Sequence, residues 1–164
     1  PEMSRGLGDV YKRQLIKGDR YRSRLISKIM FGTYNKHIKN VRTVNDWLTR
    51  DEAVVDEYNA GKLTTFLFTV NGYRGLMNMI LYVRKPRNIE RIPKNLPMLM
   101  ISGLDDPVGE YGKGVYRAYD SYHGHIDDID LRLYENCRHE LCNELNKEEI
   151  YEEIYGWIMD HMSK

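Results

Sequence analysis

Apolar residues recur at helical spacing in the first half of the chain. One stripe runs up to Phe31-Gly32, where a helix would end, and a second lies within residues 76–83. Thr49 and Glu52 stand at the spacing of a capping box, which predicts that a further helix starts there. No stretch of residues 15–84 alternates clearly like a strand, so this part is predicted to be helical. The two stripes consist of Leu25, Ile26, Ile29 and Met30, and of Leu76, Met79, Ile80 and Val83.

The pattern changes at Pro93. Residues 98–101 form a continuous apolar run, which is typical of a strand buried on both faces. Apolar and polar residues alternate over 129–134, as in a strand buried on one face at a sheet edge. A helical stripe follows each of these segments, one ending near Gly124 and one beginning at Asn146. The order strand, helix, strand, helix predicts a parallel sheet with helices on its faces.

These patterns divide the chain into three parts. Residues 1–14 begin with Pro and lack apolar periodicity, so we expect foreign linker or adapter sequence there, with a native disordered arm as the alternative. Residues 15–92 form the helical part, and residues 93–164 form the α/β part. Because two strands do not make a stable sheet alone, we expect an α/β fold that is the C-terminal end of a larger protein.

Composition and charge narrow the classes of function. The chain has 164 residues, no apolar run long enough to span a membrane and no secretory signal pattern. Its two cysteines cannot form a disulfide scaffold, so we expect a cytoplasmic protein. A net charge of +1 argues against a nucleic-acid binder. Residues 15–50, however, hold nine Lys and Arg against two Asp and Glu, which indicates either solvated helix faces or a surface that meets anionic head groups.

The strongest candidate chemistry lies in the two loops that follow the predicted strands. Asp105 and Asp106 follow the first strand, and His139 follows the second. Sites in parallel α/β sheets form at the carboxyl ends of strands, so these side chains should meet at one edge of the sheet. A carboxylate beside an imidazole holds its tautomer and stabilises the imidazolium that forms during catalysis.

Residues 96–157 resemble the C-terminal part of α/β-hydrolases of the lysophospholipase, monoacylglycerol lipase and serine aminopeptidase group. The resemblance rests on Ser102-Gly103-Leu104-Asp105-Asp106-Pro107 and on Asn136-Cys137-Arg138-His139-Glu140. It implies that Asp106, three residues after the Gly that ends the strand, is the catalytic acid and that His139 is the catalytic histidine, whereas Asp105 is a turn residue. Residues 15–92 resemble the helical cap of that family, through residues 31–35 and 42–48.

The nucleophile expected from this resemblance is absent. None of the six serines stands in a Gly-x-Ser-x-Gly motif, which these hydrolases use to present the catalytic Ser. We therefore expect two thirds of a triad, no cofactor, and no esterase activity of this chain by itself. The resemblance implies that the full-length enzyme hydrolyses a carboxylic ester of a lipid or other small acyl substrate. Residues 15–50 would favour anionic lipids or contact with a lipid surface. The serines are Ser4, Ser23, Ser27, Ser102, Ser121 and Ser163.

Other readings of the sequence stay open. The chain could be a non-catalytic interaction module, or one half of a split hydrolase that pairs with another chain, and an incomplete sheet would invite self-association. His123-Gly124-His125-Ile126-Asp127-Asp128 approaches a metallo-hydrolase motif, but its last position is Asp, so we expect a solvated loop and no metal. Cys137 and Cys142 are expected to be small apolar residues beside the site. Four tyrosines could line an acyl pocket or fill amphipathic positions of the cap: Tyr21, Tyr34, Tyr58 and Tyr73.

Overall fold

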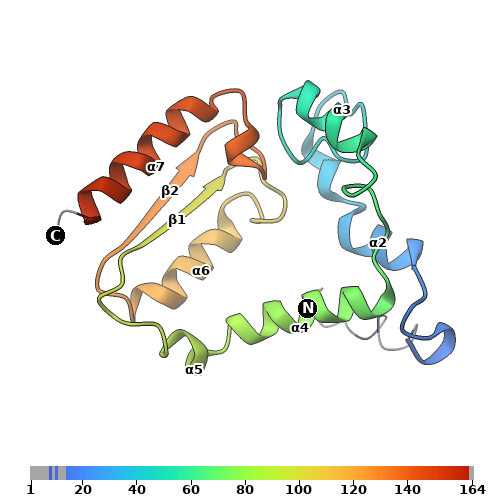
Figure 1. Cartoon of the computed structure of the whole chain (residues 1–164), viewed down its shortest axis with the longest axis horizontal. Coiled ribbons are helices and arrows are strands. Elements are labelled where there is room, and N and C mark those ends of the chain that lie inside the picture. Colours follow the sequence, from blue (N-terminus) through green and yellow to red (C-terminus); the bar gives the residue numbers. More distant parts are fainter. Residues whose placement is uncertain (1–7, 9, 11–13, 163–164) are drawn as a thin grey trace.

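The computed structural model describes residue 8, residue 10 and residues 14–162. Figure 1 shows a helical part that leads, through a long helix, into a small two-stranded sheet flanked by helices. The prediction of foreign sequence at residues 1–14 falls mostly outside the described residues. The main elements, in chain order, are α2 (Arg24–Phe31), α3 (Glu52–Ala60), α4 (Val70–Val83), α5 (Pro86–Ile89), β1 (Met98–Gly103), α6 (Lys113–His123), β2 (Ile129–Tyr134) and α7 (Lys147–Met162), with 3₁₀ helices at Tyr34–His37 and Leu141–Asn143.

The predicted order strand, helix, strand, helix is confirmed. β1 and β2 pair in parallel, in a register that runs from Met98 opposite Ile129 to Gly103 opposite Tyr134. α6 and α7 lie on opposite sides of this pair (Figure 1). α7 buries Ile150 in a cluster with two residues of the loop after β2, and Ile101 of β1 packs against the same cluster. The parallel pairing places the ends of both strands at one edge of the sheet.

The prediction that the first strand is buried on both faces is wrong for most of its length. Side chains 98–101 are half-buried, and only Ser102 and Gly103 are buried. Within the described part of the chain, β2 is the one strand that pairs with β1. β1 therefore has no described neighbour on its other side to cover its side chains.

Local sequence signals predict some of the helix ends correctly and others incorrectly. α2 begins after Ser23, whose hydroxyl accepts a hydrogen bond from Ile26 N, and it ends at Gly32 as predicted. The predicted capping box at Thr49 is wrong, because Asp51 is the N-cap of α3 and its carboxylate accepts from the amides of Ala53 and Val54. The Thr49 hydroxyl instead donates to Asn143 O, 94 residues away. The Thr49 side chain therefore makes a tertiary contact instead of capping α3.

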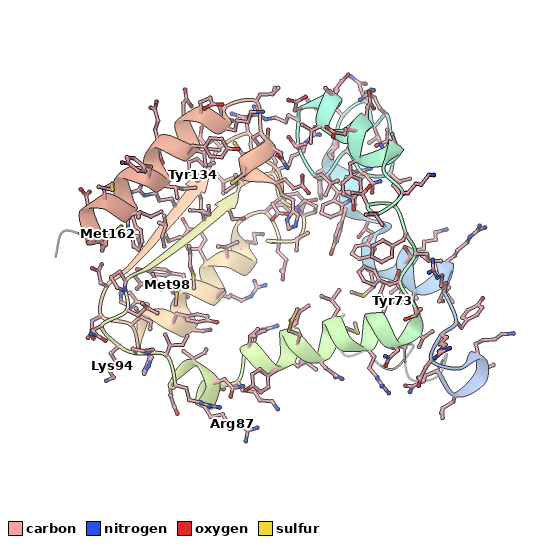
Figure 2. All side chains as sticks on the ribbon, viewed as in Figure 1. Tyr73, Arg87, Lys94, Met98, Tyr134 and Met162 are labelled. Carbon is pink, nitrogen blue, oxygen red and sulfur yellow. The ribbon has the colours of Figure 1, made fainter. Side chains whose placement is uncertain are left out.

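The long helix α4 turns a different face inward from the one predicted. Its buried residues are Val70, Tyr73 and Met77, which pack with Ile26 and Val10 in one cluster. Met79, which belongs to the predicted stripe, is 58% exposed. Figure 2 shows α4 leading from Tyr73 toward Arg87 of α5. None of the described helices is long and apolar enough to cross a membrane.

Candidate active site

Asp106 and His139 meet at the edge of the sheet where both strands end. Nδ1 of His139 lies 3.0 Å from Oδ2 of Asp106. The other carboxylate oxygen of Asp106 accepts a hydrogen bond from Val108 N at 2.8 Å, which fixes the orientation of the acid. Asp106 is 5% exposed, and the side chain of His139 is 37% exposed. The neighbouring Asp105 is exposed and makes no described bond to His139.

Backbone contacts hold the two loops together. Leu104 N donates to Tyr134 O, and Asp105 N donates to Cys137 O, both at 2.9 Å. Gly103 allows this approach, because a Cβ at this position would overlap the carbonyl oxygens of Cys137 and Arg138. The sequence therefore brings His139 to Asp106 through a glycine at the end of β1.

The hydrogen bond to Asp106 sets the protonation behaviour of the imidazole. It raises the pKa of His139, an effect that burial opposes and that the charges of Asp106 and Glu140 reinforce. An ionised carboxylate can only accept, so Nδ1 carries the proton and donates to Asp106. In the neutral ring Nε2 is then an acceptor, and no described residue hydrogen-bonds to it. The arrangement leaves Nε2 able to take up a proton from a third group.

Aromatic side chains from the helical part pack around this histidine. The ring of Trp47 lies 5.2 Å from that of His139, and Tyr34 meets Trp47 edge-on at 4.9 Å. Tyr34 is close enough to the acid that burial, first, and the charge of Asp106, second, raise its pKa. His37 meets Tyr111 of the loop after β1 in a further edge-on contact at 4.9 Å.

An open pocket lies beside Trp47. We call it the cap pocket; its volume is about 770 Å³, and it is enclosed by α2, the residues around Trp47, and the segment 58–68. Of the four cap tyrosines, Tyr58 and Tyr73 line it, and Tyr73 is also buried in the core cluster with Ile26; Tyr21 and Tyr34 do not line it. Arg24 and Lys28 add two cations to a lining that is mostly apolar. The apolar and aromatic side chains include Phe31, Val44, Trp47, Leu63, Phe66, Leu67 and Phe68.

Sequence reasoning missed a set of polar contacts behind the histidine, which we call the clasp: residues 46–50 bound to residues 137–146. Its centre is Glu144, whose side chain is fully buried. The Glu144 carboxylate accepts from Arg50 Nε at 2.8 Å and from Arg138 N at 2.7 Å. Arg138 in turn donates to the carbonyls of Asp46 and Thr49. No local pattern marks these residues, because the clasp joins segments about 90 positions apart.

The other candidate residues of the sequence analysis, His123, His125 and the two cysteines, make no described bond to Asp106 or His139. Nε2 of His125 lies 2.7 Å from Ile92 O, and the ring of His123 packs on Tyr119. In the part of the chain that is described, no three His, Cys, Asp or Glu side chains converge on a position for a metal ion. Cys137 is buried, and its thiol donates to Asn146 Oδ1 within the clasp, while Cys142 is exposed.

Known proteins resemble this chain in sequence and in fold. The sequence pattern of the family described as serine aminopeptidase, S33, matches residues 14–146. An uncharacterised abhydrolase domain-containing protein of Dictyostelium discoideum is 30% identical over 116 residues, which cover 70% of this chain and 12% of that protein.

Solved structures agree in fold at lower identity. A highly thermostable carboxyl esterase from Bacillus coagulans, in complex with glycerol, is 21% identical with a TM-score of 0.83, over 99% of this chain and 52% of its own. A lipase in an open form is 20% identical with a TM-score of 0.82, over 96% of this chain and 53% of its own. The chain thus spans about half the length of these two proteins. The strand-end loops, the parallel pair and the family match lead to one assignment: the chain belongs to the serine aminopeptidase S33 family of α/β-hydrolases.

Proposed function

We propose that this chain carries the acid and the histidine of a Ser-His-Asp triad in an ester hydrolase. Asp106 is the acid that orients His139, and His139 is the general base and then the general acid. The observation that carries the proposal is the 3.0 Å contact between Nδ1 of His139 and Oδ2 of the buried Asp106. The nucleophilic Ser would come from outside these 164 residues, since none of the serines here stands in a nucleophile-elbow motif.

The chemistry follows from which nitrogen is bound. With Nδ1–H held by Asp106, Nε2 accepts the proton of a serine hydroxyl as its oxygen attacks the ester carbonyl. The imidazolium that forms is stabilised by the Asp106 carboxylate, which is consistent with the raised pKa of His139. The same proton then passes from Nε2 to the leaving alcohol, and a water molecule repeats the sequence on the acyl-enzyme.

The cap pocket supports a substrate with an apolar acyl group. It lies beside Trp47, whose ring contacts His139, so an acyl chain in the pocket would place its ester near the imidazole. Arg24 and Lys28 on its lining favour an anionic head group, as in an acidic lysophospholipid, and the basic segment 15–50 favours contact with an anionic lipid surface. Equal kcat/KM on a neutral monoacylglycerol and on an acidic lysophospholipid would remove this substrate preference.

The test of the triad compares this chain with a protein extended upstream, in frame, to include a Gly-x-Ser-x-Gly segment. We expect no turnover of a short-chain aryl ester by the 164-residue chain. The extended protein should turn over the ester, and His139→Ala or Asp106→Asn should lower kcat by about 10⁴-fold. Asp105→Asn is the matched control, because it changes the same charge one residue away and should leave kcat unchanged. Full activity of Asp106→Asn, or turnover by the short chain that His139→Ala abolishes, would contradict the proposal.

A binding role is the second candidate, favoured by surface that the described residues leave uncovered. One edge of β1 has no described partner strand, and Met79 and other apolar residues of α4 are exposed. Such surfaces accept a pairing segment or chain. Sedimentation and thermal melting of the 164-residue chain separate the candidates: a monomer that melts cooperatively favours an independent module, and an aggregated or molten chain favours part of a hydrolase.

A further inference from the structure

Glu144 is a buried charge that the proposed mechanism does not use. Its side chain is fully buried, and its partners are all N–H donors: Arg50 N, Arg50 Nε, Arg138 N and Leu145 N, at 2.7–3.4 Å. A carboxylate removed from water is costly unless such donors surround it. The buried carboxylate therefore depends on these donors, and it lies five residues after His139.

The contacts of Glu144 join the two sides of the imidazole. Arg138 N, bound by Glu144, belongs to the residue before His139. Arg50, bound by the same carboxylate, ends the segment that carries Trp47. Between these anchors the two backbones bond directly, since His139 N donates to Trp47 O at 3.4 Å and Glu140 N donates to Leu48 O at 2.7 Å. The ring of Trp47 contacts that of His139 at a tilt and also lines the cap pocket.

We propose that Glu144 is a positioning residue that holds His139 between Asp106 and the wall of the cap pocket. Its carboxylate fixes the backbone before His139 to the segment that carries Trp47, so that the imidazole keeps both its bond to Asp106 and its contact with the Trp47 ring. The proposal rests on the proposed function for the role of His139, and it adds the group that sets the geometry of that residue. Through the same contacts, Glu144 also fixes the position of Trp47, which lines the cap pocket, relative to His139.

The test is Glu144→Gln in the 164-residue chain. The amide is nearly isosteric, but its NH₂ group would face donors only, so one of the bonds to Arg50 or Arg138 is lost. Glu148→Gln is the matched control, because Glu148 is exposed and the substitution removes the same charge four residues away. The readouts are NMR titration of the His139 imidazole and hydrogen exchange of the Arg138 amide.

In Glu144→Gln we expect the pKa of His139 to fall toward its ordinary value, and the Arg138 amide to exchange roughly tenfold faster. Glu148→Gln should change neither. Asp106 and Glu140 are the carboxylates that raise the pKa of His139. Arg50→Lys keeps every charge and removes the Nε donor, so a fall of this pKa in both Glu144→Gln and Arg50→Lys reports geometry rather than a lost neighbouring charge. An unchanged His139 titration in folded Glu144→Gln overturns the proposal.

Two further variants keep the outcome decisive. If Glu144→Gln does not fold, Arg50→Lys replaces it: the charge stays, the Nε donor is lost, and the pKa of His139 should again fall, so an unchanged titration overturns the proposal. Asp106→Asn separates the two levels of the argument. If it lowers the pKa of His139 and the clasp variants do not, only the positioning role fails. If Asp106→Asn leaves that pKa unchanged, the proposed triad fails instead.

Discussion

The clasp and the C-terminal half of α4 differ in which kind of side chain they bury. In the clasp, Glu144 is fully buried among four N–H donors, and its partner Arg50 lies 94 residues away. Along α4 the reverse holds: apolar side chains such as Met79 and Val83 stay exposed. Neither region follows the simple rule that apolar residues go inside and charged ones go outside.

The difference separates what the described residues complete from what they leave open. The clasp lies beside Asp106 and His139 and needs no further segment to satisfy it. The exposed face of α4 and the unpaired edge of β1 have no covering element among the described residues. The contact between Asp106 and His139 is therefore built within the described residues, whereas the exposed face of α4 and the free edge of β1 are open to further structure.

The largest effect should come from the apolar support under the clasp. Ile150 of α7 is fully buried against Cys137 and Leu141. Ile150→Ala should lower the free energy of unfolding by about 2–5 kcal/mol, because it removes buried methyl groups and leaves a cavity. Met79→Ala on α4 is the control and should lower it by less than about 0.5 kcal/mol. Urea unfolding measures both. An equal loss in the two variants would mean that the α4 face is covered in solution, and the contrast between the regions would disappear.

A smaller loss is expected where the backbone of β1 meets the loop that carries His139. In Gly103→Ala the new Cβ overlaps the carbonyl oxygens of Cys137 and Arg138, so the loop must shift, at about 1–3 kcal/mol of unfolding free energy. Gly75→Ala is its counterpart in α4, where a Cβ meets nothing within 4 Å. It should raise stability by about 0.5–1 kcal/mol through the lower entropy of the unfolded chain. Neutral behaviour of Gly103→Ala would show that the loop tolerates displacement.

Features set by local interactions could be predicted from the sequence, whereas features set by distant contacts could not. The parallel pair and the ends of α2 and α6 follow from local periodicity and from glycine stops. The proximity of Asp106 and His139 could be predicted because each residue follows a strand at a short distance. In the structure Oδ2 of Asp106 and Nδ1 of His139 are 3.0 Å apart. Their roles stay a prediction. A local pattern predicts only contacts between residues a few positions apart, or between residues that parallel strands bring to one edge of a sheet.

Three of the failures have the same physical cause, which is a tertiary contact. Thr49 looked like a helix cap because of Glu52, but its hydroxyl bonds Asn143 and leaves Asp51 to cap α3. Glu144 carries no local signal at all, since its partner Arg50 lies 94 residues away. The stripe on α4 was assigned to the wrong face because the cluster around Tyr73 decides which side is covered. In each case a partner far along the chain determines where the side chain lies.

The smallest expected effect concerns the pH dependence of stability in the region around His139. The bond to Asp106 raises the pKa of His139 above its value in the unfolded chain. Protonated His139 therefore stabilises the folded chain; this contribution is complete below the unfolded pKa, near pH 6.5, and is lost as the pH rises through the folded pKa. The Tm difference between the unaltered chain and Asp106→Asn should accordingly be largest at the acidic end of the interval from about pH 5.5 to 9 and should shrink toward the alkaline end.

Asp105→Asn sharpens this measurement, because it removes the same charge from an exposed side chain that makes no described bond to His139. Its Tm should run parallel to that of the unaltered chain over the whole interval. A difference for Asp106→Asn that stays constant with pH would mean that the bond does not distinguish the imidazolium from the imidazole. The acid would then hold the loop by hydrogen bonding alone, through Val108 N and Nδ1 of His139. A shrinking difference instead ties the stability of this edge of the sheet to the charge state that the proposed reaction uses.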